Sequence, residues 1–236
     1  MNVVDFIILG IVGVSILFGL YKGFVNAVLG LVGLFVALGA AYMMYPQLAR
    51  RLQEDESLIR TLTHYTDALS RVGDLDLSLT PVAGMTQQAL NDILQRAALP
   101  APFDAFVRAN VTNQVFASLG SVTISQYLNQ TIIAVSINIL CFLVSFGISY
   151  AAVMLLVHLI SYVFQMPVLK HLDLLLGGVF GGIRGIFLVF VLFALVPILL
   201  TVSPIEQVSQ YISESRFAGM FYKSNIIQTI MQGTLF

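Results

Sequence analysis

The sequence predicts an all-α integral membrane protein with about four transmembrane helices and an extramembrane segment of amphipathic helices. Its 236 residues are 58% hydrophobic and only 10% charged, whereas soluble domains are about 45–50% apolar and about 25% charged. This composition argues against a soluble enzyme and against a disordered chain, which needs low hydrophobicity and high charge. A net charge of −1 gives no electrostatic basis for binding nucleic acid.

Long stretches without charged residues mark the predicted spans. No Asp, Glu, Lys or Arg occurs in residues 109–169 or 185–205, and residues 1–45 contain only Asp5 and Lys22. About 20 apolar residues are enough for a helix to cross a bilayer core. A single segment in lipid must satisfy its own backbone hydrogen bonds, so we expect these stretches to be helices.

Residues 1–45 are predicted to form a transmembrane helical hairpin. One straight helix of this length would be about twice as long as the hydrocarbon core is thick, so the chain must turn. We expect the turn at Lys22-Gly23, because lysine is favourable at a membrane surface and glycine tolerates tight turns. Pro46 is expected to end the second helix. No basic segment precedes the first apolar run, so we expect a retained span rather than a signal peptide.

Residues 131–202 are predicted to contain the second transmembrane pair. The third span is expected over 131–164. Two interpretations of the fourth span remain open. It begins either near Leu172, which places Arg184 within the membrane, or near Ile183. In the second case residues 172–182 form an interfacial or re-entrant piece, because glycine weakens helices.

Residues 46–130 and the tail, 203–236, are predicted to form amphipathic helices. Apolar residues of the first segment recur at intervals of three and four, and turn-forming Gly, Pro and Asp residues separate the resulting stretches. The polar faces are not rich in Lys or Arg, so we expect packing against protein rather than insertion into the membrane interface. The apolar positions are Leu58, Ile59, Leu62, Tyr65 and Leu69, then Met85, Ala89, Leu90, Ile93, Leu94 and Ala97, and then Phe103, Phe106, Val107 and Val111.

Four spans place the N-terminus, residues 46–130 and the tail on one side of the membrane. Lys22 and Lys170 then lie on the other side. The positive-inside rule gives most weight to short loops, so it favours the cytoplasm for these two lysines. Arg50 and Arg51 favour the opposite orientation. We expect residues 46–130 to be extracytoplasmic.

Two stretches of the sequence resemble the colicin V production protein family, small bacterial inner-membrane proteins with about four spans. The first is Asp5 followed by Tyr21-Lys22-Gly23-Phe24, similar to the family's acidic residue and basic-Gly pair. The second is LDLLLGGVFGGIRG, residues 172–185. It matches a D-x-x-x-G-x-x-x-G-x-x-R-G pattern at Asp173, Gly177 (or Gly178), Gly181, Arg184 and Gly185. The sequence departs from the family at Leu174, where a basic residue is usual, and in the greater length of residues 46–130, whose role is therefore not implied.

The resemblance implies a multi-pass protein of the bacterial cytoplasmic (inner) membrane that serves colicin V (toxin) production or export, or envelope maintenance. We expect a non-enzymatic accessory or scaffold whose partners are the lipid bilayer and an envelope or export protein. The alternative is a small oligomeric transporter or channel in which Asp5, Lys22, Asp173 and Arg184 line a polar path. The family offers no catalytic, cofactor-binding or metal-binding residue to carry over. The sequence has no phosphate-binding loop, His-Glu-x-x-His motif or Gly-x-Ser-x-Gly elbow.

Glycines spaced four residues apart form a glycine zipper in the second stretch. Gly177, Gly181 and Gly185 lie on one helix face, and Gly19 and Gly23 repeat the spacing in the first stretch. Small residues at this spacing let membrane helices approach closely. We expect them to serve helix packing, within one chain or between copies in a homo-oligomer, in preference to lining a pathway.

Ionisable residues in or near membrane spans are candidates for function by default. Four of them, Asp5, Lys22, Asp173 and Arg184, are either interface markers or functional groups. In a straight helix Asp173 and Arg184 lie about 16 Å apart along the axis, so they cannot pair directly. His158 is a candidate proton carrier, because imidazole gains and loses a proton near neutral pH.

Overall fold

The structure is a computed structural model that describes residues 2–66, 79–100, 103–117, 122–163, 170–202, 206–223 and 225. Within these residues every regular element is a helix, apart from an isolated antiparallel bridge between Pro81 and Thr123. The chain divides into two compact units. Unit 1 comprises Met1–Leu48, Leu140–Ala194 and Glu206–Ile227, and unit 2 comprises Ala49–Ile139, Leu195–Ile205 and Gln228–Phe236.

Among the described residues, three helices are long and apolar enough to cross a membrane. They are α1 (Val3–Gln53), α7 (Ile124–Val163) and α8 (Lys170–Phe193), the last followed by the short helix α9 (Val196–Val202). Large apolar side chains cover their outer faces, where a soluble protein would place polar ones. Lipid is the solvent that suits such a surface, so the chain is an all-α membrane protein. Examples more than half exposed are Leu17, Ile148, Leu155, Leu159, Leu175 and Val179.

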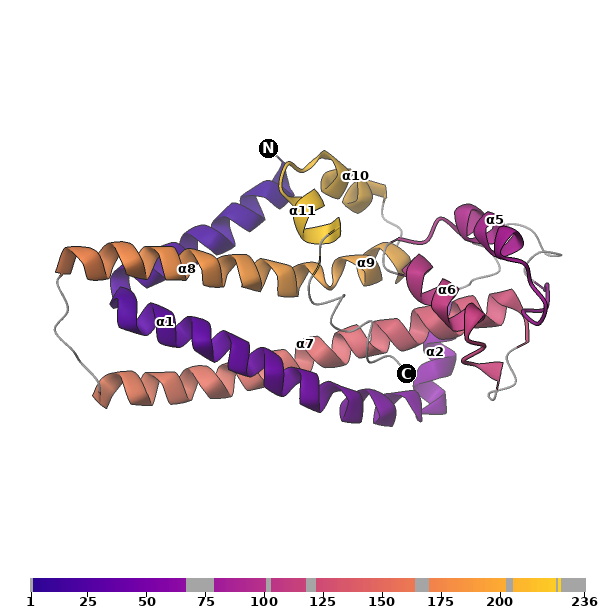
Figure 1. Ribbon diagram of the computed structural model, residues 1–236, viewed down its shortest axis with the longest axis horizontal. Coiled ribbons are helices and arrows are strands. Elements are labelled where there is room, and N and C mark those ends of the chain that lie inside the picture. The colour runs from indigo at the N-terminus through magenta and orange to yellow at the C-terminus, as the bar shows by residue number, and fades with distance from the viewer. Residues whose placement is uncertain are drawn as a thin grey trace. The chain divides into compact units, whose positions relative to one another are not determined.

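Helix α1 is a hairpin of two arms, 3–22 and 24–53. The break is at Gly23, whose φ of 81° and ψ of 174° are not helical. Figure 1 shows the chain reversing its direction there. The turn lies where the Lys22-Gly23 pair predicts it, and division of α1 into two arms raises the number of long apolar segments to about four.

Pro46 does not end the second arm, contrary to expectation, because the helix continues to Gln53. Proline removes one backbone hydrogen bond and costs roughly 3 kcal/mol in a helix interior. Side-chain packing offsets this cost next to the proline, where Tyr45 is 1% exposed and its ring lies 5.9 Å from that of Phe142 on α7. Sequence pattern alone does not reveal this packing.

Helix α8 begins at Lys170 and runs without interruption through the glycine-rich stretch. The candidate span, Asp173–Thr201, begins where the first interpretation of the fourth span expects it. The position of Arg184 within the membrane stays a prediction. A turn at 194–195 ends α8, and α9 follows. Pro197 occupies the first turn of α9, where a missing backbone N–H is tolerated.

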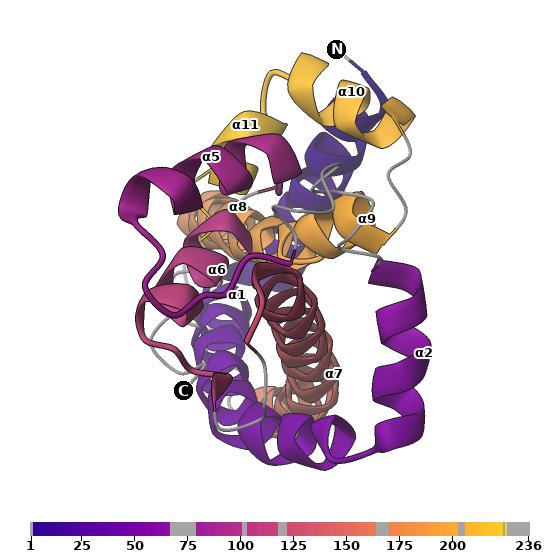
Figure 2. The ribbon, with the colours of Figure 1, turned by 90° about the vertical axis from the view of Figure 1, so that its right-hand side faces the viewer.

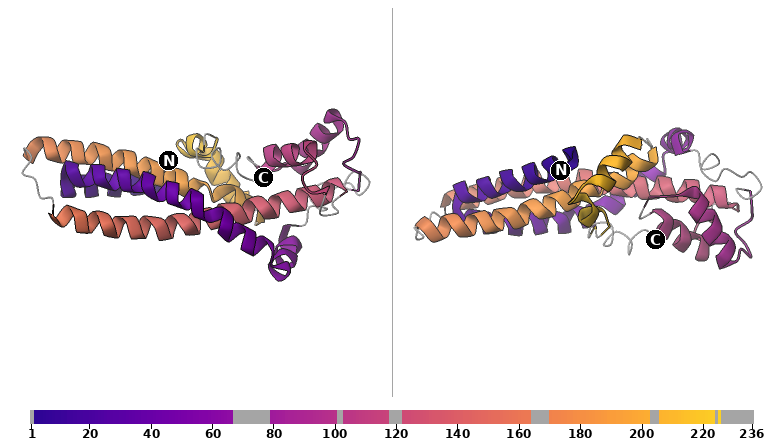
Figure 3. Two further views of the ribbon diagram at one scale, coloured as in Figure 1. Left: turned by 60° about the horizontal axis from the view of Figure 1, so that its bottom comes forward. Right: turned by 90° about the horizontal axis from the view of Figure 1, so that it is seen from above.

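Unit 1 is a bundle of long helices. Figure 3 shows the arms of α1, α7 and α8 running side by side. Aromatic pairs join the second arm of α1 to α8: the ring centroids of Phe24 and Phe180 lie 5.4 Å apart, and those of Phe35 and Phe187 4.9 Å apart. The tail forms α10 (Glu206–Glu214) and α11 (Ala218–Lys223), and the Phe221 ring packs 4.8 Å from that of Phe190 on α8.

Unit 2 packs short amphipathic helices around the beginning of α7. Figure 2 shows α2 (Glu56–Thr66) on one side of α7, with α5 (Gln87–Ala97) and α6 (Phe103–Thr112) on the other. The α5 and α6 stripes found in the sequence face protein. Tyr65's side chain and Leu69 lie outside the described part of the chain. The buried core includes Leu90, Ile93, Leu94, Ala97, Phe103, Phe106, Val107, Val111, Tyr127 and Leu128.

Candidate functional site

The first arm of α1 and α8 approach each other backbone to backbone. A Cβ atom added to Gly19 would collide with the Gly177 carbonyl, and one added to Gly177 would collide with the Gly19 carbonyl. A Cβ on Gly181 would lie 2.5 Å from the Ser15 carbonyl oxygen. The Ser15 hydroxyl donates a 2.7 Å hydrogen bond to the Gly181 carbonyl. A Cβ on Gly185 would meet Val12 Cα at 3.0 Å. The glycine stripe of α8 therefore lies against a small-residue stripe of the same chain.

Asp173 in the first turn of α8 caps the second arm of α1. Its Oδ1 accepts a 2.8 Å hydrogen bond from the backbone N–H of Phe24, the first residue after the break. The first N–H groups of a helix have no partner within it, and a carboxylate also complements the helix dipole. A Cβ on Gly23 would collide with this carboxylate, so glycine is required there both for its positive φ and for space.

Asp5 is fully buried and joins the N-terminus to the tail. Its Oδ2 accepts a 3.0 Å bond from the Asn2 backbone N–H. Its Oδ1 accepts a 2.6 Å bond from the Ser215 hydroxyl and a 3.3 Å bond from the Phe217 backbone N–H. The carboxylate thus anchors the segment between α10 and α11.

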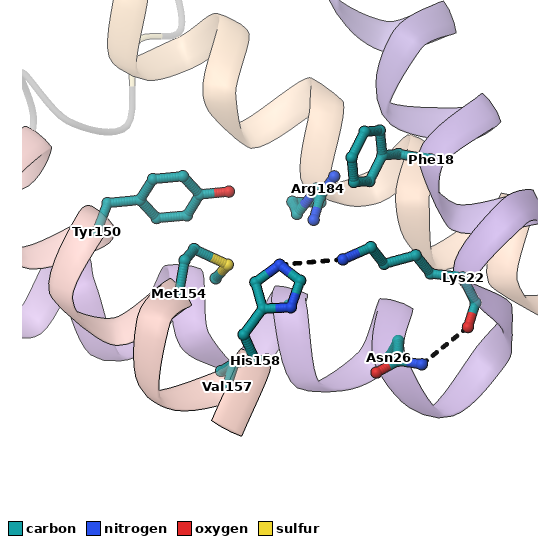
Figure 4. Close-up of a pocket in the computed structure, with 9 residues that line it drawn as sticks. Phe18, Lys22, Asn26, Tyr150, Met154, Val157, His158 and Arg184 are labelled. Carbon is teal, nitrogen blue, oxygen red and sulfur yellow. Dashed lines mark hydrogen bonds between the residues drawn. The ribbon is translucent and has the colours of Figure 1, made fainter. Parts of the chain in front are cut away.

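Three basic side chains gather around a cavity of about 250 Å³ within unit 1. Figure 4 shows Lys22 from the first arm of α1, His158 from α7 and Arg184 from α8 pointing toward the same space. The cavity is lined by Phe18, Lys22, Asn26, Gly30, Tyr150, Met154, Val157, His158 and Arg184. We call this space the basic cavity.

Contacts fix the basic groups in place. Lys22 Nζ lies 3.0 Å from His158 Nε2, at hydrogen-bond distance. The same Nζ lies 5.4 Å from the centroid of the Phe18 ring, at cation–π distance. Arg184 Nε donates to the Ser15 hydroxyl at 3.3 Å. The guanidinium also lies against Gly30, where an added Cβ would be 3.0 Å from Nη1.

The structure brings only some of the candidate residues together. Lys22, His158 and Arg184 share the basic cavity, whereas Asp173 caps Phe24 and Asp5 holds the tail. A path lined jointly by the two acids and the two bases is therefore not supported. His158 contacts Lys22 through its Nε2, and its role as a proton carrier stays a prediction.

Sequence reasoning missed several residues of the site. Ser15 continues the four-residue spacing of Gly19 and Gly23 by one step, so a search for any small residue would have found it. Tyr150 and Ser215 carry no such signal, because their roles depend on segments far away in the chain. Within the described residues, no three His, Cys, Asp or Glu side chains form a group that could hold a metal ion.

Comparison with known proteins adds one finding. A family model described as "Colicin V production protein" matches residues 4–95 and 110–225, which is most of the chain and includes parts of both units. No curated protein and no solved structure matches the chain.

Proposed function

This chain belongs to the colicin V production protein family, and from that premise we propose that it is a non-enzymatic accessory protein of the bacterial cytoplasmic membrane. It acts as a scaffold in colicin V production or export, or in envelope maintenance. The family match carries this proposal. The long apolar helices support the membrane location, since nothing but lipid suits their exposed side chains.

Residues 46–130, which belong almost wholly to unit 2, are the part that we propose as the surface for an envelope or export partner. Helices α5 and α6 of this segment bury their apolar faces in a core of their own, and their polar faces remain exposed. A segment with its own core can hold a surface of defined shape without help from the lipid. We propose further that this segment is extracytoplasmic, because Lys22 at the hairpin turn favours the cytoplasm.

The test is a gene deletion in a colicin V-producing strain. We expect the deletion to lower the amount of colicin V in the medium while the toxin accumulates in cells, or to sensitise the cells to detergent. A plasmid copy of the wild-type gene should restore both measurements, and a copy with Gly177→Leu, which disrupts the contact of α1 with α8, should not. A matched copy with Gly13→Leu, at a position with open space around it, should restore them. Unchanged toxin release and unchanged detergent resistance in the deletion strain would contradict the proposal.

A further inference from the structure

The basic cavity contains more positive charge than its lining compensates. Lys22 and Arg184 both line this space, and none of the residues that line it is acidic. The ion pair between Arg60 and Glu56 lies in α2, far from this cavity in the sequence. Asp173, which lies beside the hairpin turn next to Lys22, accepts the Phe24 amide.

A cation in a membrane span is unfavourable unless its donors have partners, and Arg184 lies within the candidate span Asp173–Thr201. Charged side chains in spans normally pair with each other, with backbone carbonyls or with a ligand. Arg184 uses its Nε on Ser15, and among the described residues its two Nη groups have no acceptor. A guanidinium presents these donors as a planar fork that matches the oxygens of an anion.

We propose that the basic cavity binds a phosphoryl group, with Arg184 and Lys22 as its main ligands. The donors come from three helical segments and surround one space, so they suit a group that carries several acceptor oxygens (Figure 4). The Tyr150 hydroxyl points toward Arg184 in the same view and supplies a further donor. The Asn26 side-chain amide donates to the Lys22 carbonyl at 2.9 Å, across the break at Gly23, and so helps to fix the hairpin turn that presents the lysine.

The size of the cavity limits what enters. Its volume of about 250 Å³ is below the roughly 300–1,000 Å³ of sites for drug-sized ligands. A cavity of this volume can hold a single phosphate or the phosphoryl part of a lipid headgroup, but not a large solute. Lys22 lies next to the hairpin turn at Gly23, and basic pockets between membrane helices near the headgroup layer bind anionic lipids. The phosphoryl group comes either from such a lipid or from free phosphate.

The lipid source is tested on the purified full chain in detergent. Native mass spectrometry would count phosphatidylglycerol molecules retained after mixing with equal amounts of phosphatidylglycerol and phosphatidylcholine. We expect the wild-type chain to retain phosphatidylglycerol selectively. Lys22→Gln and Arg184→Gln should each lower its apparent affinity roughly tenfold or more, as expected for a lost charged hydrogen bond.

The free-phosphate source is tested by the thermal unfolding midpoint with inorganic phosphate or chloride at equal ionic strength. A rise with phosphate that is lost in both variants, without lipid selectivity, assigns the site to soluble phosphate. Lys22→Gln leaves the bond between Arg184 and Ser15 in place, so it tests the site even if Arg184→Gln does not fold. Arg50→Gln, an exposed cation outside the cavity, is the matched control.

The inference is overturned if neither probe binds selectively, or if Arg50→Gln has the same effect as the two cavity variants. It does not depend on the proposed function. Binding is measured on purified protein, whereas the accessory role is measured as toxin release and detergent resistance in cells. Loss of binding in a variant that still restores toxin release would separate the two.

Discussion

The carboxylate of Asp173 accepts the backbone N–H of Phe24 at 2.8 Å, so that a residue of one membrane helix caps another that begins far away in the sequence. The cap explains why the hairpin can break within a single residue. Gly23 supplies the non-helical dihedral angles, and Asp173 satisfies a backbone donor that the break would otherwise leave without a partner. The acidic residue and the glycine of the two family stretches therefore act together.

Removal of the cap should destabilise the hairpin. We expect Asp173→Ala to lower the free energy of unfolding by about 1 kcal/mol, the usual cost of losing an N-terminal cap. Asp173→Asn retains an oxygen acceptor and should lose less. The thermal unfolding midpoint in detergent, followed by circular dichroism, measures both. Equal losses in the two variants would show that the hydrogen bond to Phe24 is not the cause.

The close contact of Gly19 with Gly177 gives a second prediction. Gly177→Ala places a methyl group against the Gly19 carbonyl, and overpacking of this kind costs about 1–3 kcal/mol. Gly13→Ala, on the same arm of α1, has no atom within 4 Å of the added Cβ. That variant should be neutral or slightly stabilising, because alanine favours helix more than glycine by up to about 1 kcal/mol.

Unfolding of the two variants under identical conditions separates packing from propensity. If Gly177→Ala is as stable as Gly13→Ala, the helices do not approach as closely as the structure has them. The contact also uses the glycine face within one chain, so a homo-oligomer formed through the same face would have to compete with it.

The sequence predicts the helices better than it predicts their partners. The uncharged stretches and the Lys22-Gly23 pair place the long helices and the hairpin turn, because each depends on local composition. Pro46 is misleading because the continuation of the helix depends on a contact distant in the sequence, the packing of Tyr45 against Phe142.

The candidate site, too, is predictable from the sequence only in its residues and not in their contacts. The basic residues and the glycine spacing are visible in the sequence, but their convergence is not. Lys22 and His158 are 136 positions apart, and Arg184 and Ser15 are 169 positions apart. Only the fold shows that Asp173 and Asp5 lie on separate hydrogen-bond networks rather than with the two bases.

The bond from Ser215 to Asp5 should hold the tail in place. The Ser215 hydroxyl donates a 2.6 Å hydrogen bond to the Asp5 carboxylate, which is fully buried. We expect Ser215→Ala to loosen the segment between α10 and α11 and to speed trypsin cleavage after the exposed Arg216 several-fold. Ser213→Ala, whose hydroxyl bonds only the Gln210 carbonyl in the same helix, is the matched control. Equal cleavage rates in the two variants would argue against an anchoring role for Asp5.

The beginning of α2 should depend on pH through Asp55. Hydrogen bonds from the Ser57 hydroxyl and from the backbone N–H groups of Leu58 and Ser57 hold the pKa of Asp55 below its usual value. A lowered pKa means that this cap contributes stability above the ordinary aspartate pKa of about 3.9, and that the contribution disappears as the pH falls through the lower folded value. Amide exchange at Ser57 and Leu58, measured against Asp55→Asn at each pH, should show protection that is lost only at acidic pH. If amide exchange at Ser57 and Leu58 is the same in the wild-type chain and in Asp55→Asn at every pH, the Asp55 carboxylate does not stabilise the beginning of α2.

The orientation of the hairpin gives the last prediction, and two single-cysteine variants test it in a Cys141→Ser background. Gln88 is an exposed residue on α5 in unit 2, and Tyr21 is 88% exposed beside the turn of α1. Lys22 favours the cytoplasm for that turn, because short loops dominate the positive-inside rule. In intact spheroplasts, a membrane-impermeant maleimide should therefore label Gln88→Cys and not Tyr21→Cys, which should react only after the membrane is permeabilised.

The two positions together separate the orientation from the hairpin itself. Labelling of Tyr21→Cys alone would mean that Arg50 and Arg51, next to the end of the second arm, have determined the orientation. Residues 46–130 would then face the cytoplasm, and the proposal that they bind an envelope partner would be wrong. Labelling of both positions in intact spheroplasts would place both ends of the second arm on one side. That outcome would contradict a second arm that crosses the membrane, whatever its orientation.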